Sequence, residues 1–388
     1  MPVTRIPVHG PVLVWARVSA GLDVATAAER VSTKPERLLK WETEELSPTL
    51  NQLRKLSEVY SRPLGALMMS EVPNETPPDV LPDFRRSSRQ VETDPKALQK
   101  AIVRARRQRA DLLEVSELMG EEPETRRPAF SFRLTDTPES IGEKIRELLR
   151  FESIPRRTYS RPDDLLRHLV RGVEDLGVIV IQVQSVSSDV MRGFSLAEEQ
   201  FPIIALNGAD WPRGKIFTLL HEMVHVGLRH GGICDLQHES DDKVERLCDA
   251  SAGCALMPKD TILHLASNLQ RPLTIDQLSA VGHEFGASGE AAMLRLVNLG
   301  HASWDEYDEL REPFRSAYRK FKDDEKRYRD PDAPIYYQLK VRDLGRPFIR
   351  KILRAYGEDV VSSRDLAVML NVKFDNVPRL ASMVGGNG

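Results

Sequence analysis

The segment His221-Glu222-Met223-Val224-His225 constrains this chain more than any other feature. On a helix, the pattern H-E-x-x-H places two imidazoles one turn apart on a single face, with a carboxylate beside them. The residues from Lys215 to Leu228 favour such a helix, because Phe217, Leu220 and Val224 recur at helical spacing. The pattern therefore predicts two ligands of a zinc ion on one helix. The alternative interpretation is a pair of hydrogen-bonded, half-buried histidines.

We expect the helix that carries the two histidines to end at Gly231 and Gly232. A second helical pattern follows it. It runs from Asp242 to Pro258 and carries Glu245 and Asp249 on one side. Zinc hydrolases with this motif use three protein ligands and leave the fourth position to water, so Glu245 is the predicted third ligand. Asp249 is expected to accept the outer ring N–H of a ligand histidine. The alternative for both acids is a solvated helix face.

These residue types suggest a division of labour in hydrolysis. Zinc lowers the pKa of bound water and polarises a carbonyl group, and the predicted metal ligands are His221, His225 and Glu245. Glu222 is not expected to bind the metal. It is the predicted catalytic base, which takes the proton of the water and delivers it to the leaving amine.

Several separated motifs resemble, in the same order, those of the ImmA/IrrE family of zinc metallopeptidases. The similarity covers residues 135–300. The resemblance implies a thermolysin-like active site with the residue roles given above. It also implies cleavage of a helix-turn-helix repressor in a stress or mobile-element response. The motifs are Ile216–His225, Glu245–Asp249 and Ala255–Pro258, preceded by Gly193–Ser195 and Pro202–Asn207; the departures are Cys248 for a small residue, Asp249 for Asn and Ser251 for an aromatic residue.

The first seventy residues form a separate helical pattern. We expect helices at 12–20 and 24–31, a third that begins at Pro35, and a fourth at 49–60. This spacing is typical of a helix-turn-helix unit whose third helix reads DNA. Lys40-Trp41-Glu42 and Ser47-Pro48-Thr49 resemble the XRE-type repressor domain.

On that interpretation four side chains, two just before the third helix and two on it, would face the major groove. Arg37 is the best candidate to read a base. The nearby acids Glu42, Glu44 and Glu45 weaken the electrostatic case, because phosphate attraction dominates DNA affinity. The alternative is a helical module that pairs with the helix-turn-helix domain of another protein. The predicted DNA-binding residues are Thr33, Lys34, Arg37 and Lys40.

Between these regions, residues 95–119 have the pattern of one long charged helix, for which a solvated face is the favoured interpretation over a contact with DNA. Three short strands are expected at 177–184, 191–196 and 203–206. The second is the candidate edge strand, which would hold an extended substrate through main-chain hydrogen bonds. Its predicted substrate-binding residues are Arg192, Gly193 and Phe194.

Composition sets the outer bounds. The chain has 388 residues, enough for two or three domains, and a net charge of −3, which argues against a strongly basic nucleic-acid binder. No stretch is long and apolar enough to span a membrane, and the N-terminus lacks the apolar core of a signal peptide, so we expect a cytoplasmic protein. Three cysteines are too few for a disulfide framework. Cys234 lies in the loop between the two ligand helices, and one interpretation of it is a regulatory thiol near the metal.

The predicted fold is α+β and mainly helical. Its four segments are a helix-turn-helix domain at 1–72, a linker with the long charged helix at 73–130, a zinc metallopeptidase domain with a small sheet at 131–300, and a helical region at 301–388. A homodimer through residues 94–118 or the N-terminal unit is an open alternative.

Two classes of function remain from the sequence. The first is a cytoplasmic zinc endopeptidase that cleaves a helix-turn-helix repressor and carries its own DNA-binding-type domain. The second is a DNA-binding regulator whose peptidase-like domain senses a metal or a ligand. Glu222 favours the first, because a sensor has no need of a catalytic base.

Overall fold

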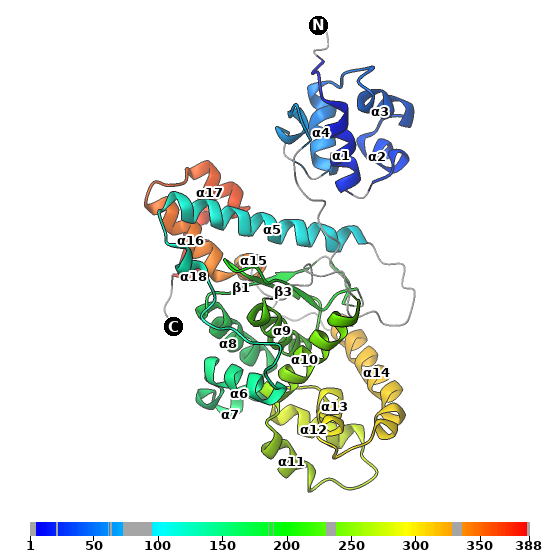
Figure 1. Cartoon of the computed structure of the whole chain (residues 1–388), viewed down its shortest axis with the longest axis vertical. Coiled ribbons are helices and arrows are strands. Elements are labelled where there is room, and N and C mark those ends of the chain that lie inside the picture. Colours follow the sequence, from blue (N-terminus) through cyan, green and yellow to red (C-terminus); the bar gives the residue numbers. More distant parts are fainter. Residues whose placement is uncertain are drawn as a thin grey trace. The chain divides into compact units, whose positions relative to one another are not determined.

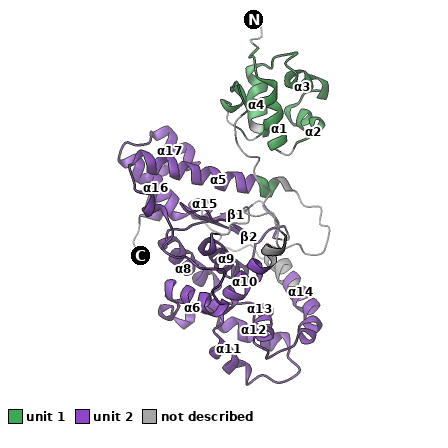
Figure 2. Cartoon of the chain, in the orientation of Figure 1, with its two compact units in different colours: residues 1–80, 94–99 green, residues 81–93, 100–388 purple. Residues whose placement is uncertain are grey.

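The chain forms two compact units (Figure 2). Unit 1 comprises residues 1–80 and 94–99, and unit 2 comprises residues 81–93 and 100–388. The computed structural model describes residues 5–20, 22–60, 62, 64–72, 95–184, 186–188, 190–229, 238–327 and 336–385, with the side chains of 58, 95–96, 238–242 and 320–327 excepted. The predicted linker residues 73–94 and Cys234 lie outside the described residues.

Unit 1 is a cluster of short helices around an apolar core. Asp23 begins one of them by accepting a hydrogen bond from the backbone N–H of Thr26, as a capping residue does. The largest fully buried side chain among its described residues is that of Trp41. The helices are α1 (Gly10–Ser19), α2 (Val24–Val31), α3 (Pro35–Glu42) and α4 (Leu50–Tyr60), followed by the 3-10 turn Ala66–Met68.

A buried ion pair ties α1 to α3. The guanidinium of Arg17 donates from Nε to Glu42 Oε1 at 2.6 Å and from its terminal nitrogen to Glu42 Oε2 at 3.0 Å. Glu44, one of the acids expected to repel DNA, instead accepts a hydrogen bond from the backbone N–H of Gly10 at 2.7 Å. Glu45 accepts a hydrogen bond from Thr43 Oγ1 at 3.1 Å, so all three acids near the end of α3 are engaged within unit 1.

Unit 2 is mostly helical and contains one three-stranded sheet (Figure 1), as an α+β fold requires. Its strands are β1 (Ile179–Val183), β2 (Gly193–Leu196) and β3 (Ile203–Asn207). Its helices are α5 (Pro95–Leu118, entering from unit 1), α6 (Pro138–Leu148), α7 (Arg156–Tyr159), α8 (Pro162–Asp175), α9 (Pro212–Leu228), α10 (His238–Leu256), α11 (Lys259–Ala266), α12 (Ile275–Glu284), α13 (Gly289–Asn298), α14 (Trp304–Arg327), α15 (Tyr336–Leu344), α16 (Arg346–Gly357), α17 (Ser363–Met369) and α18 (Val377–Val384).

The sheet has the strand order β1-β3-β2, with β1 parallel and β2 antiparallel to the central strand β3. Figure 1 shows α8 and α9 on one side of the sheet and α15 on the other. Alternate residues of each strand serve these two layers: Val180, Ile204 and Leu206 join the core of the α8–α9 side. Gly345 has a positive φ of 77° and lies so close to β1 that an added Cβ would be 3.0 Å from Val180 O. This glycine allows the C-terminal helices to approach the sheet closely.

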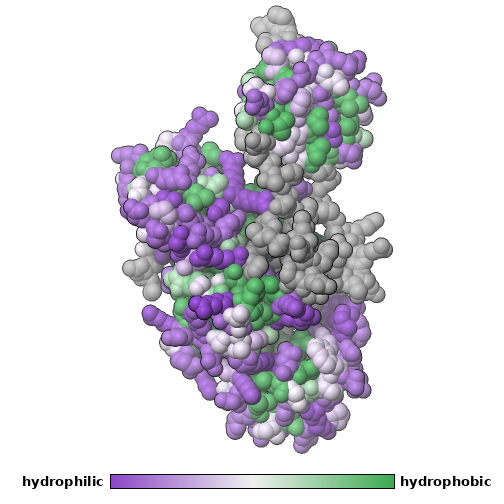
Figure 3. Space-filling view, viewed as in Figure 1, coloured by the Kyte–Doolittle hydropathy of each residue, from purple (hydrophilic) through white to green (hydrophobic). Residues whose placement is uncertain are grey.

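The long charged helix α5 is not a solvated spacer. Its apolar side is buried at Ile102, Ala105, Leu112 and Val115. The buried amide of Gln108 donates a hydrogen bond to the carbonyl of Leu344, so α5 is fastened to the C-terminal helices. Its outer side stays charged, and the visible face around α5 and α17 is mainly hydrophilic (Figure 3). A one-sided apolar stripe among many arginines explains why charge content alone favoured the solvated interpretation.

Most predicted elements are confirmed within a few residues, including the three strands. The helices α7, α11, α15 and α18 were not predicted. The end of α9 is also different: the helix stops at Leu228, and Arg229 adopts a left-handed φ of 56°, before the expected glycines are reached. No helix among the described residues is long and apolar enough to cross a membrane.

Candidate metal centre

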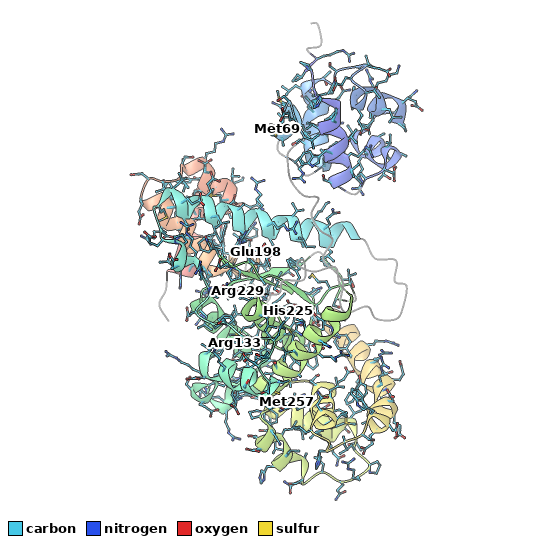
Figure 4. All side chains as sticks on the ribbon, viewed as in Figure 1. Met69, Arg133, Glu198, His225, Arg229 and Met257 are labelled. Atoms are coloured by element: carbon cyan, nitrogen blue, oxygen red, sulfur yellow. The ribbon has the colours of Figure 1, made fainter. Side chains whose placement is uncertain are left out.

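The helix α9 runs through the interior of unit 2 and carries both His221 and His225. Pro212 occupies its first turn, where a missing N–H costs nothing. His221, Glu222 and His225 are 3%, 7% and 6% exposed, so all three polar side chains face a mostly enclosed space. Figure 4 shows the labelled His225 on this helix in the middle of unit 2. Burial of three such groups calls for compensating partners.

Helix α10 supplies the partners, and α6 holds it in place. Gly142 of α6 lies against α10 so closely that an added Cβ would be 2.6 Å from the Cβ of Cys254 and 2.9 Å from the backbone nitrogen of Ala255. Cys254 and Cys248 are both buried and form no disulfide. This tight contact, together with packing on α9, turns the side of α10 that bears Glu245 towards the two histidines.

Three donor atoms converge on one point. His221 Nε2 lies 3.1 Å from His225 Nε2 and 3.3 Å from Glu245 Oε2, and His225 Nε2 lies 2.9 Å from Glu245 Oε1. Ligand atoms bound tetrahedrally at zinc distances are about 3.3 Å apart, so the two Nε2 atoms and one carboxylate oxygen of Glu245 fit three corners of such a site. Among the described residues this is the one group of histidine, cysteine or acidic side chains with that geometry. The donor set therefore fits a divalent ion such as zinc.

Asp249 fixes the orientation of the first histidine. Its Oδ1 lies 2.8 Å from His221 Nδ1, on the side of the ring away from Glu245. If Nδ1 carries the proton and donates it to this carboxylate, the lone pair of Nε2 is free for a metal. Asp249 is half exposed, whereas the ring it contacts is buried.

The electrostatics of the cluster favour a positive charge. Burial by itself lowers the pKa of His225, but hydrogen bonds with Cys248 and Glu245 outweigh it and raise that pKa well above its ordinary value. For Glu245, burial raises the pKa, yet the hydrogen bonds with His221 and His225 leave the pKa below the usual range. The carboxylate thus stays ionised inside the unit, and it attracts a cation to the point where the donors meet.

Glu222 lies beside the edge of the sheet. An added Cβ at Gly193 of β2 would be 3.4 Å from Glu222 Oε1 and 2.4 Å from the methyl group of Thr218. The absence of a side chain at Gly193 therefore lets β2 lie directly against the part of α9 that carries the proposed base. The sequence signal for this contact was a single glycine in a strand pattern.

The hydrogen-bond pattern of β2 separates the predicted substrate residues. Asn207 N donates to Arg192 O at 2.9 Å, so the backbone groups of Arg192 point towards β3. Because these groups alternate in an antiparallel pair, those of Phe194 also point to β3, and those of Gly193 and Ser195 point outwards. Of the three predicted residues, only Gly193 offers outward main-chain groups. Ser195 also has outward groups; it lies within the predicted edge strand 191–196 and is 2% exposed.

In unit 1, the side chains proposed for DNA lie on the open side of α3. Lys34, Arg37 and Lys40 are exposed and Thr33 is half-buried, while Leu38 and Trp41 face the core. The same open side also carries two residues that the sequence reasoning left out. They are Glu36 and Leu39, and both follow from the helical spacing of the buried positions.

Comparison with known proteins gives one finding. Residues 173–297 match the model of a peptidase family described as the IrrE N-terminal-like domain. The matched range includes the whole sheet, α9 and α10, and so contains every residue of the cluster described above. No curated protein and no solved structure matches the chain. Residues 173–297 of unit 2 are thus similar to a metallopeptidase-like domain.

Proposed function

We propose that unit 2 is a zinc-dependent endopeptidase. The observation that carries the proposal is the meeting of His221, His225 and Glu245 at one point, with Glu222 one residue from the first ligand and beside an edge strand. When bound there, zinc would lower the pKa of a water molecule and polarise the scissile carbonyl. The histidines and Glu245 hold it, and Asp249 keeps the His221 ring oriented.

Glu222 is the proposed general base. It sits on the same helix as the ligands but is not one of the converging donors, so its carboxylate is available for proton transfer. It would take a proton from the attacking water and deliver it to the leaving amine. Its low exposure excludes bulk water and strengthens electrostatic interactions with a substrate.

The edge strand β2 is the proposed substrate platform. The N–H and C=O groups of Gly193 and Ser195 point away from β3, and an extended peptide would pair first with the half-buried Gly193, because Ser195 is 2% exposed. Such a peptide would run beside Glu222, because Gly193 is the residue nearest to that carboxylate on the strand. Ser195→Pro removes one outward N–H and should raise KM, whereas Ser195→Ala keeps the N–H and should leave KM near the wild-type value. Equal KM values for the two variants would argue against the platform.

The substrate is proposed to be a helix-turn-helix repressor, in line with the family that the motifs resemble. The decisive experiment compares wild type with Glu222→Gln on a panel of repressors encoded near this gene, with zinc content measured in parallel. We expect full zinc occupancy and a loss of cleavage on the order of 10²–10⁴-fold. Glu284→Gln, at an exposed position of α12, is the matched control and should cleave normally.

The alternative function makes a different prediction in the same experiment. If unit 2 only senses a metal or a ligand, wild type and Glu222→Gln will bind zinc equally and neither will cleave any repressor. A variant that keeps full cleavage without the Glu222 carboxylate would contradict the proposed mechanism.

For unit 1 we propose DNA binding through α3. The support is the exposure of Lys34, Arg37 and Lys40, together with the internal engagement of Glu42. In the full chain, Arg37→Ala and Lys40→Ala should each weaken DNA binding and lower the slope of log affinity against log salt by about 1 when a phosphate contact is lost. Arg54→Ala, exposed on α4, is the control. Unchanged binding in the two α3 variants would favour a protein partner instead.

A further inference from the structure

Arg213, in the first turn of α9, is a buried arginine without a polar partner. Its residue surface is 7% exposed, and Nε is fully enclosed with no hydrogen-bond acceptor. Throughout the described part of the chain, Arg213 forms neither a hydrogen bond nor an ion pair. A buried charge without such a partner costs several kcal/mol, as a rough order of magnitude.

The other buried arginines of unit 2 have the hydrogen-bond acceptors that Arg213 lacks. Arg295 is 4% exposed, donates from Nε to Met257 O at 3.1 Å and lies 3.6 Å from Glu139. Arg126 is 6% exposed and donates to the backbone oxygen of Glu121. Each of these guanidinium groups has an acceptor in the protein. Arg213 is the exception among the buried arginines that the structure describes.

The immediate surroundings of Arg213 suit an anion. Its guanidinium carbon lies 5.3 Å from the centre of the Trp211 ring, so one face of the cation rests on an aromatic surface. Burial lowers the pKa of Arg213, and no described carboxylate is close enough to raise that pKa again. The cation therefore has an aromatic surface on one face and no described acid as a partner.

From this arrangement we infer that Arg213 and Trp211 form a binding site for the oxyanion of a small ligand, a carboxylate or a phosphate. The planar guanidinium donates two parallel hydrogen bonds to such a group. The site differs from the metal centre, because Arg213 lies eight residues before His221, more than two turns along α9. Both sites share one helix, which gives an anion a rigid connection to the histidine pair.

The test measures the thermal unfolding midpoint of the full chain in inorganic phosphate and in acetate, with chloride at equal ionic strength as the reference. The main variant is Arg213→Met, which keeps the length of the side chain and removes its charge. In chloride we expect Arg213→Met to unfold at a higher temperature than wild type, because it no longer buries an unpaired charge. Phosphate or acetate should raise the wild-type midpoint by about 2 °C or more at saturation and leave the variant unchanged.

Arg295→Met is the matched control. It removes a buried arginine that already has its acceptors, so its midpoint should fall in every buffer while its response to phosphate stays as in wild type. Whichever of phosphate and acetate saturates at the lower concentration identifies the anion. The same titration in Glu222→Gln should match wild type, which separates this site from the proposed peptidase activity.

Two results would overturn the inference. One is a wild-type midpoint that phosphate and acetate leave unchanged, or that they raise equally in Arg213→Met. The other is an Arg213→Met midpoint below wild type in all buffers, as in Arg295→Met, which would make Arg213 a structural residue stacked on Trp211.

Discussion

The two units each bury a cluster of charged side chains, and the clusters are satisfied in different ways. In unit 1, Arg17 and Glu42 pair through two short hydrogen bonds and leave no donor directed at empty space. In unit 2, His221, His225 and Glu245 bring three possible metal-ligand groups together at one point. The hydrogen bonds between them require a proton on an imidazole, and a metal ion can take the place of that proton. An ion pair that needs no further cation indicates a structural role, whereas converging metal-ligand groups indicate a site.

The largest expected effect concerns the converging cluster. Glu245→Gln replaces the anionic ligand by a neutral amide of the same shape, so zinc affinity should fall by more than the roughly 10–100-fold that loss of an outer partner costs. Zinc content after dialysis measures this directly. A chelator should lower the unfolding midpoint of wild type and leave that of the variant unchanged. Full zinc content in Glu245→Gln would contradict the role of Glu245 as a zinc ligand, and with it the contrast between the two clusters.

Substitution in the ion pair of unit 1 should change the stability of the unit and leave zinc binding unchanged. Arg17→Met leaves Glu42 buried without a partner and should destabilise unit 1 by about 3–5 kcal/mol, while Arg17→Met with Glu42→Leu should recover most of that loss. Urea unfolding of the full chain, followed by tryptophan fluorescence, measures both. Neither variant should change zinc content. A double variant as unstable as the single one would show that the two residues stabilise unit 1 by more than compensating each other's buried charge.

Glu174 is an intermediate case, a buried acid with one backbone partner. Its carboxylate accepts a hydrogen bond from Arg346 N at 3.0 Å, but burial dominates and raises the pKa to about 7, against the opposing effects of Arg346 and Arg350. An acid with a raised pKa contributes its stability fully below its unfolded value of 4.5 and loses it as pH rises through about 7.

Unit 2 should therefore lose on the order of 3 kcal/mol between pH 4.5 and 8 through this group, and Glu174→Gln should remove that dependence. The free energy of unfolding measured at both pH values tests the prediction. The amide keeps an oxygen that accepts the Arg346 N–H, so the variant should be the more stable protein at pH 8. Identical pH profiles for wild type and variant would contradict the assignment.

The smallest effect is expected at the rim of the metal cluster. Asp249→Asn keeps a hydrogen-bond acceptor for His221 Nδ1 but removes the charge, so zinc affinity should fall by roughly 10–100-fold or less. A competition assay with a chromogenic chelator measures the change. The fold should be unaffected, because the side chain is half exposed. Unaltered affinity would place Asp249 outside the group of residues that tune the metal site.

Much of the candidate site was predictable because its spacing is local. His221, Glu222 and His225 are set one turn apart by the helix itself, and Glu245 and Asp249 by the next helix. The same holds for the helices of unit 1, whose apolar positions recur with the helical period. The predicted end of α9 at Gly231 failed because Arg229 adopts the left-handed conformation that glycine usually provides.

The sequence by itself therefore determined which side of each helix is apolar and which possible ligand residues share a side. It also determined where an edge strand could form. Tertiary structure alone decided which faces meet. It packed α5 onto the C-terminal helices, directed the outward backbone groups to Gly193 and Ser195, and enclosed Arg213 without an acceptor. These outcomes depend on contacts between residues far apart in sequence, and no local period encodes the distance or the burial that such contacts impose.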